Sequence, residues 1–266
     1  VVAQILLYNG YNVISLDNLL YRNQICVPSK AHYKSYQFIY GDMLTVDSMS
    51  QLIDLVDVVV LLAGLIGDPI TKKYPKESLI INDQGVKNVI DICASKGGKK
   101  LIYVATCSNY GFIEGNELAD EEHELRPLSL YAKSKVNSEK YIFSLKGKTE
   151  MIPTILRFAT AFGISPRMRF DLTVSEFTRN IALDKGLIVY DAETWRPYCH
   201  VLDFARLIQM VIESAEEKVS FEVFNAGGQV NNATKKMIVN FILEKIPKGK
   251  VNYQEQGNDP RNYRVN

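Results

Sequence analysis

The feature that most constrains the fold is the apolar run Val58–Leu62, in which every residue is aliphatic. Such a run is typical of a strand with both faces buried, and strands of this kind belong to parallel sheets covered by helices. Strand-like runs alternate with segments of helical periodicity such as Ser48–Val56. We therefore expect an α/β fold of right-handed βαβ units with a doubly wound parallel sheet. The other expected strands are Tyr11–Leu16, Gln37–Tyr40, Leu101–Ala105, Thr154–Phe158 and Leu187–Tyr190, and the other expected helices are Val1–Tyr8, Tyr74–Lys96, Tyr131–Leu145, Phe170–Leu183, Leu202–Ala215 and Asn232–Ile246.

The composition excludes several classes of partner. The net charge of +1 gives no electrostatic basis for binding nucleic acid or an anionic membrane. No apolar run approaches the roughly 20 residues that a membrane span requires. The four cysteines have no C-x-x-C spacing and the three histidines are dispersed, so we expect neither a metal site nor a disulfide framework. A cytoplasmic location fits these features best.

The segment Ser129–Lys135 contains a Tyr-x-x-x-Lys pair, Tyr131 and Lys135, at the start of an expected helix. A spacing of four places both side chains on one helical face. An ammonium beside a phenol favours the phenolate, so Tyr131 can serve as a base below its ordinary pKa of about 10. An ordinary helix-face aromatic is the alternative, since this spacing also arises by chance.

Other candidates stand where expected strands end. Asp17 follows the expected strand Tyr11–Leu16. An acid at the end of a second strand is where a doubly wound dinucleotide-binding fold holds the adenosine ribose, although an acid that simply ends a strand at a turn is at least as common. Asp42 and Met43 follow the next strand. Ala63 and Gly64 follow Val58–Leu62, and their small side chains permit a ligand to approach the backbone closely.

Taken together, these stretches resemble the extended short-chain dehydrogenase/reductase family of sugar-nucleotide epimerases and dehydratases. Thr106 stands five residues before Gly111, as the family's catalytic Ser/Thr stands before its Tyr-Gly pair, and the segment Arg196–Asp203 is similar to Arg-x-Tyr-x-His-Val-x-Asp. The resemblance is closest to the GDP-heptose C4 dehydrogenases, which hold NAD tightly. It rests there on Leu156–Arg169, Asp17-Asn18-Leu19, Leu65–Pro69 and Asp259-Pro260-Arg261.

The resemblance implies a Rossmann-type sheet in an NAD-binding domain over residues 1–160, and a smaller substrate-binding lobe over 161–266 with some segments returning to the sheet. It implies catalysis by Thr106, Tyr131 and Lys135, with Tyr131 taking the hydroxyl proton. His200 is expected to be structural and Cys107 to be packing. The expected NAD contacts are Asp17, Asn18, Asp42, Met43, Leu62, Ala63, Gly64, Asn82, Tyr131 and Lys135, and the candidates for the nucleotide diphosphate are Arg167, Arg169, Arg196 and Arg261.

Two departures from the family pattern stand out. The family's first strand and glycine-rich pyrophosphate loop would lie immediately before Val1, so we expect both to be missing from this chain. Cys107-Ser108 also replaces the Asp-Glu pair that follows the catalytic Thr in dehydratases, which argues against dehydration.

The main hypothesis is therefore an NAD-dependent oxidoreductase that acts at C4 of a nucleotide-linked sugar, preferably GDP-hexose or GDP-heptose. A UDP- or GDP-sugar 4-epimerase is the alternative, because the same three residues serve both reactions. A non-catalytic nucleotide-binding protein is an alternative of another class. A homodimer built through the helices Tyr131–Leu145 and Tyr74–Lys96 is an expectation from the family.

Overall fold

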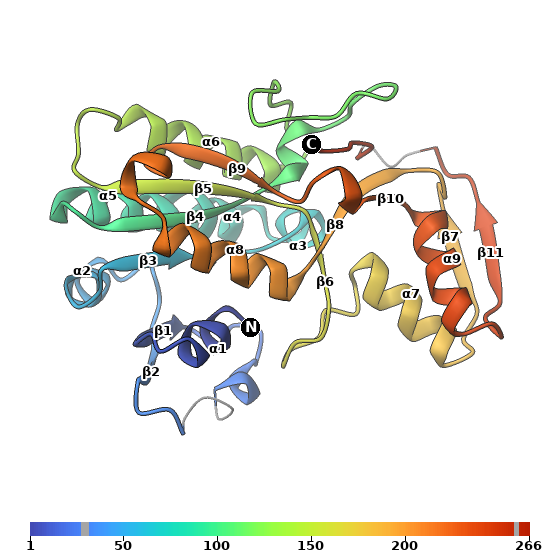
Figure 1. Ribbon diagram of the computed structural model, residues 1–266, viewed down its shortest axis with the longest axis horizontal. Helices are drawn as coiled ribbons and strands as arrows, with labels where there is room; N and C mark the ends of the chain where they lie inside the picture. The colour runs from blue at the N-terminus through green and yellow to red at the C-terminus, as the bar shows by residue number, and fades with distance from the viewer. Residues whose placement is uncertain (28–31, 258–260) are drawn as a thin grey trace.

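The computed structural model describes residues 1–27, 32–257 and 261–266 (Figure 1). Its central sheet has four parallel strands in the order β3-β4-β5-β9. Strands β1 and β2 form a separate parallel pair, so the single doubly wound sheet expected from the sequence is present as two sheets. The strands are β1 Val13–Asp17, β2 Tyr36–Tyr40, β3 Val58–Leu61, β4 Lys100–Thr106, β5 Ile152–Phe158 and β9 Glu222–Ala226.

Helices cover both faces of the central sheet. Alternate residues of β4 point to opposite faces, as the pleat requires. Leu101 and Tyr103 join a core with the helices α2, α5 and α6, whereas Ile102 joins a core with α8. This double covering explains why the central strands are almost wholly apolar. The helices are α1 Val2–Tyr8, α2 Val46–Asp54, α3 Asp68–Lys73, α4 Pro75–Ser78, α5 Val86–Lys96, α6 Leu130–Ser144 and α8 Val201–Glu213. Among the helices described, none is both long and apolar enough to cross a bilayer.

The later part of the chain builds a smaller unit at the end of the molecule opposite α5 (Figure 1). Two small sheets, β10-β8-β6 and β11-β7, pack with α7 and α9 around their own apolar core. Strand β9 returns to the central sheet and pairs with β5. The elements are β6 Thr160–Phe162, α7 Thr173–Ala182, β7 Leu187–Tyr190, β8 Trp195–His200, β10 Asn232–Thr234, α9 Lys235–Lys245 and β11 Val251–Gln254.

Two expected helices differ from the structure. Asn232–Ile246 begins as strand β10, because Asn232–Thr234 pairs with β8, and Thr234 then caps α9 by accepting a hydrogen bond from the Met237 N–H. The expected helix Tyr74–Lys96 is interrupted by a π-helical turn, Leu79–Gly85. Turns of this kind occur frequently at functional sites, and this one contains Asn82.

Candidate active site

The carboxyl end of β4 continues directly into a 3-10 turn, Cys107–Tyr110. Thr106 is the last residue of the strand and is 8% exposed. Its hydroxyl oxygen caps the turn by accepting a hydrogen bond from the Ser108 N–H, at 3.2 Å. Thr106 therefore has a structural capping role, which holds its hydroxyl at the edge of the sheet where parallel α/β folds bind ligands.

Helix α6 brings Tyr131 and Lys135 to the same strand. Ser129 caps the helix through a 3.1 Å hydrogen bond from the Ala132 N–H, which fixes where it begins. The helix packs against β4 and against the turn after Thr106. The Lys135 ammonium donates to the Val104 carbonyl at 2.7 Å and lies 5.9 Å from the centre of the Tyr131 ring. Both residues are buried: Tyr131 is 9% exposed and Lys135 is 5% exposed.

The charge states of this pair differ from the expectation. Burial raises the pKa of Tyr131, the charges of Asp68 and Tyr263 raise it further, and Arg169 lowers it. Burial also lowers the pKa of Lys135 to about 8, and Glu139 opposes that shift. The expectation that the pKa of Tyr131 lies below its ordinary value is wrong for this geometry. The reason is that the ammonium is directed at a backbone carbonyl and both groups are withdrawn from water.

The expected adenosine-binding residues lie at the ends of the paired strands β1 and β2. Asp17 accepts a hydrogen bond from the Leu19 N–H at 2.6 Å, and Asn18 donates to Asp42 at 2.9 Å. Met43 is buried in the core between the sheet and α5 and packs close to Gly85. The structure thus brings Asp17, Asn18 and Asp42 together, whereas it gives Met43 a packing role.

Asn82 holds the loop that follows β3. Its side chain accepts from the Leu65 N–H at 2.8 Å and donates to the Leu65 carbonyl at 2.9 Å. Gly64 has φ +150°, and a Cβ there would lie 2.9 Å from Asn82 Oδ1. Leu62 and Ala63 are exposed just beyond the end of the strand. The backbone turn at Gly64 therefore requires glycine. Because β3 and β4 are neighbours, this turn lies beside Thr106 at the carboxyl edge of the sheet.

The four candidate arginines have different surroundings. Arg167 lies over the Tyr21 ring at 4.5 Å, and Arg169 forms two hydrogen bonds with Asp171, at 2.8 and 2.7 Å. Arg261 pairs with Asp68 at 3.1 Å. Arg196 is buried, and its charge acts on Tyr263 together with that of Arg261. Arg169, Arg196 and Arg261 are thus grouped electrostatically around Tyr131 and Tyr263. Asp259 and Pro260 lie outside the described residues.

Two other residues weighed from the sequence have structural roles. The Nδ1 atom of His200 accepts from the Leu202 N–H at 3.2 Å and so caps α8. Cys107 is fully buried, and its thiol contacts the Arg157 carbonyl oxygen at 3.1 Å. Burial raises the pKa of this thiol, which makes it a poor acid–base group.

Sequence reasoning gave no site role to Asn23, Asp68, Ser108 or Tyr263. Tyr263 is buried, and its hydroxyl lies 3.2 Å from that of Ser108. A small cavity of about 40 Å³ is lined by Asp68, Ser108, Ser129 and Arg261. Of these, Ser129 is the residue that caps the helix carrying Tyr131. These residues come from distant segments, so no local motif indicates that they meet.

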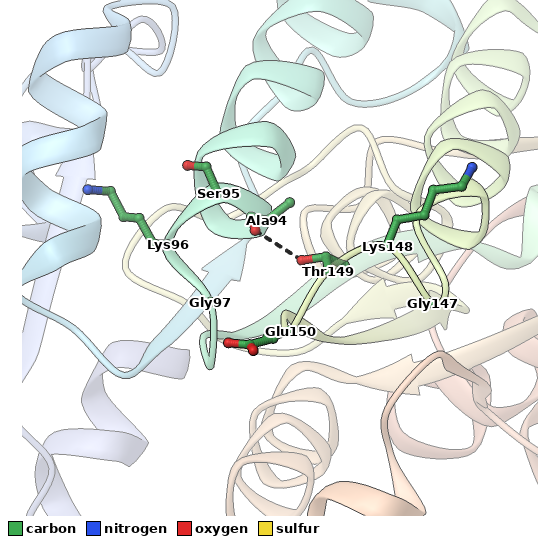
Figure 2. Close-up of a pocket in the computed structure, with 8 residues that line it drawn as sticks. All are labelled: Ala94, Ser95, Lys96, Gly97, Gly147, Lys148, Thr149 and Glu150. Atoms are coloured by element: carbon green, nitrogen blue, oxygen red, sulfur yellow. Dashed lines mark hydrogen bonds between the residues drawn. The ribbon is translucent and has the colours of Figure 1, made fainter.

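A second hollow has no connection with this site. It lies between residues 94–97 and 147–150, where Thr149 donates to the Ala94 carbonyl at 3.0 Å (Figure 2). Both segments precede the strands β4 and β5, so the hollow is at the amino ends of the sheet. Thr106 and Gly64 lie at the carboxyl ends.

The hydrogen-bond acceptors at the end of β1 fit the adenosine end of NAD. Among the described residues, the buried Oδ1 atom of Asn23 has no hydrogen-bond partner, and the amide nitrogen of Asn23 lies 3.5 Å from Asp17. An orphaned acceptor beside a carboxylate suits a pair of ribose hydroxyls, which are donors. Gly64 supplies the close backbone approach that a dinucleotide needs near the sheet edge.

Comparisons with known proteins agree with this fold. A Bacillus subtilis protein named as an uncharacterized UDP-glucose epimerase is 25% identical, covering 86% of this chain and 72% of its own. The NAD complex of Thermus thermophilus UDP-glucose 4-epimerase matches with a TM-score of 0.83 and 21% identity, covering 100% of this chain and 86% of that one. The complex of Bacillus cereus UDP-glucuronic acid 4-epimerase with UDP-glucuronic acid and NAD matches with a TM-score of 0.86 and 24% identity. This match covers 99% of this chain and 83% of that one.

These matches give no support to two expectations. One is the resemblance to GDP-heptose C4 dehydrogenases, and the other is that the first strand and the glycine-rich loop are missing. The family itself is established, because the model of the NAD-dependent epimerase/dehydratase family matches residues 1–227. With its parallel α/β sheet and the buried Thr106, Tyr131 and Lys135, the chain belongs to the NAD-dependent epimerase/dehydratase family.

Proposed function

We propose that this protein is an NAD-dependent 4-epimerase of a UDP-linked sugar. The observation that carries the proposal is the buried cluster at the carboxyl end of β4, where Tyr131 and Lys135 share one face of α6 beside Thr106. The relatives named above as UDP-sugar epimerases support this choice over C4 oxidation of a GDP-hexose or GDP-heptose. Cys107-Ser108, in place of an acidic pair, argues against dehydration.

In the proposed reaction, the hydroxyl on C4 of the sugar gives its proton to the Tyr131 phenolic oxygen. Thr106 donates a hydrogen bond to the same sugar oxygen and holds it in place. Bound NAD would supply reversible hydride transfer at C4, and Tyr131 would return the proton to the sugar oxygen once the hydride is delivered to the opposite face of the rotated ketone. Asp17, Asn18, Asn23 and the backbone at Gly64 would hold NAD at the edge of the sheets.

Base catalysis by Tyr131 also needs a change of charge around it. Burial disfavours the phenolate, so a cation must approach the phenolic oxygen more closely than Lys135 now does. Lys135 is suited to this, because its long side chain is held by a single hydrogen bond to the Val104 carbonyl. Arg196 and Arg261 would bind the diphosphate of the nucleotide, with Arg169 nearer to the phenol.

The helices expected to form a dimer carry exposed apolar side chains, which supports the proposal of a homodimer. Leu79 and Ile80 are 63% and 47% exposed, and Phe143 on α6 is 38% exposed. A contact between two copies through these helices would remove this apolar surface from water.

The test is to incubate the purified protein with NAD and, separately, UDP-glucose, UDP-glucuronic acid and GDP-mannose. Products are resolved by NMR, and NADH is followed by absorbance. The proposal predicts a C4 epimer of a UDP-sugar without net NADH. Stoichiometric NADH with a keto-sugar would favour the dehydrogenase instead, and no turnover of any sugar would favour the non-catalytic alternative.

Tyr131→Phe provides the mechanistic control. It removes only the phenolic oxygen, and we expect kcat to fall by about 10²–10⁴-fold, as for loss of a general base. Tyr141→Phe makes the same change on the same helix, where the hydroxyl contacts Asp91 instead of the cluster. That variant should keep its rate. Equal rates for Tyr131→Phe and the wild type would contradict the mechanism.

A further inference from the structure

A charged pair is enclosed behind the catalytic cluster. Glu139 lies one helical turn after Lys135 on α6, and Arg157 lies on the neighbouring strand β5. They are 2% and 4% exposed, and their closest contact, from an Arg157 guanidinium nitrogen to Glu139 Oε2, is 2.8 Å. Withdrawing two charges from water is costly, and such a pair often contributes little to stability. Its position beside the catalytic residues therefore calls for another role.

The pair is connected to the turn that follows Thr106. Asn109 donates to Glu139 Oε1 at 2.6 Å, and Arg157 donates to the Tyr110 hydroxyl at 3.0 Å. Asn109 and Tyr110 are the last two residues of that turn. The hydrogen bonds thus tie the helix that carries Tyr131 and Lys135 to the turn that is capped by Thr106.

The network also has an outer support. Arg157 donates to the Glu121 carbonyl at 2.9 Å, and the Tyr110 hydroxyl donates to Asn225 at 2.7 Å. Asn225 belongs to β9, so the turn is held from the sheet as well as from the helix. A displacement of Glu139 would be passed to the turn through short, buried hydrogen bonds, which leave few alternative partners.

We propose that Glu139 is a positioning residue of the catalytic cluster: with Arg157 it fixes the turn after Thr106, and its carboxylate is the anion that accompanies the buried Lys135 ammonium. This inference rests on the proposed catalytic roles of Thr106, Tyr131 and Lys135. It adds a residue that touches neither substrate nor cofactor and acts through those that do.

The charges around Lys135 support this assignment. Tyr103 from β4 lies under the ammonium at 4.7 Å and Tyr131 lies at 5.9 Å, both measured to the ring centres. Asp83, from the π-helical turn, acts on Tyr103, and Asp68 acts on Tyr131. Among the described groups, Glu139 is the one whose charge raises the pKa of Lys135 against the effect of burial.

Three variants separate charge from shape. Glu139→Gln keeps the hydrogen bond to Asn109 and removes the carboxylate charge. The double variant Glu139→Gln with Arg157→Gln removes both members of the ion pair, so no buried guanidinium is left without its carboxylate and the variant remains informative where the single variant fails to fold. Arg157→Lys keeps both charges and removes the guanidinium fork, which makes it the matched control for the charge on Glu139.

The first readout needs neither substrate nor cofactor turnover. Lysine side chains are labelled with ¹³C and titrated by NMR, with the Lys135 signal assigned by its loss in Lys135→Met. We expect the pKa of Lys135 to fall by about one unit in both variants that lack the Glu139 carboxylate, and to stay unchanged in Arg157→Lys. An unchanged pKa in a folded variant without that carboxylate overturns the proposal.

The second readout is the rate against pH. In the folded variants without the carboxylate, kcat should fall by about 10–100-fold, as for a small displacement of catalytic groups, and the alkaline limit of activity should move to lower pH. A loss of stability alone would leave that limit in place and would contradict the proposal. An inactive wild type would refute the proposed function, and the NMR titration would still decide the role of Glu139.

Discussion

Replacing Lys135 with Met removes a buried ammonium and leaves a side chain of similar length. We expect wild type and variant to differ in the free energy of unfolding by an amount that depends on pH. Lys135 is 5% exposed, and burial lowers its pKa from 10.5 to about 8. The unfolded chain therefore binds this proton more tightly than the folded chain. Between these two pKa values, unfolding takes up a proton, so the stability of the wild type rises with pH relative to the variant.

The size of this change follows from the pKa difference of 2.5, which is 10.5 less 8. At about 1.4 kcal/mol per pKa unit, it amounts to about 3 kcal/mol. Below the folded pKa the wild type bears the whole penalty, so the variant gains about 3 kcal/mol there. It also loses the 2.7 Å hydrogen bond to the Val104 carbonyl, which costs about 1–3 kcal/mol. At neutral pH the variant should thus be as stable as the wild type or more so, by about 0–2 kcal/mol.

The assay is urea unfolding at several pH values from about 7 to about 10.5, followed by the fluorescence of Trp195, the one tryptophan of the chain. Lys133→Met is the control, because Lys133 is exposed on the same helix. Only the Lys135 variant should become less stable relative to the wild type as pH rises. A difference that stays constant across this range would refute the burial argument, and kcat should be lost in the Lys135 variant at every pH.

Two further predictions concern the cofactor edge. Gly64→Ala should lower the free energy of unfolding by about 1–3 kcal/mol in urea, because φ is +150° and the new Cβ would lie 2.9 Å from Asn82 Oδ1. Gly98→Ala, at a positive φ with no atom within 4 Å, is the control and should cost less. Asp17→Asn should raise the affinity for NADP relative to NAD by about tenfold in calorimetric titrations, since a like-charge contact is worth about 1–4 kcal/mol. An unchanged ratio would remove Asp17 from the ribose site.

The central sheet could be predicted because its signals are local. The apolar run at Val58 and the helical periodicity of Ser48–Val56 each determine their element without help from the rest of the chain. Strand β10 could not be predicted, since Asn232–Thr234 is a strand only through its pairing with β8. The π-helical turn around Asn82 likewise depends on the loop after β3, which Asn82 holds through Leu65.

The candidate site, like the fold, has features that local sequence predicts and features that depend on distant segments. Spacing alone places Tyr131 and Lys135 on one helical face, and the structure agrees. Their charge states depend on burial and on neighbours from other segments, such as Asp68 and Glu139. Local spacing contains no information on such neighbours. Burial therefore raises the pKa of Tyr131 above its ordinary value, whereas the sequence predicted a lowered one.

The last residues of the chain connect the catalytic turn with the smaller unit. The N–H of Tyr263 donates to the Trp195 carbonyl at 3.2 Å, while its hydroxyl lies beside Ser108. Arg261, two residues earlier, pairs with Asp68, the first residue of α3. A nucleotide sugar bound by Arg196 and Arg261 would thus act on the same short segment that contacts the catalytic turn. Under the proposed function, substrate binding and catalysis would share this segment, and the residues that complete the active site would come from both sides of the expected boundary at residue 160.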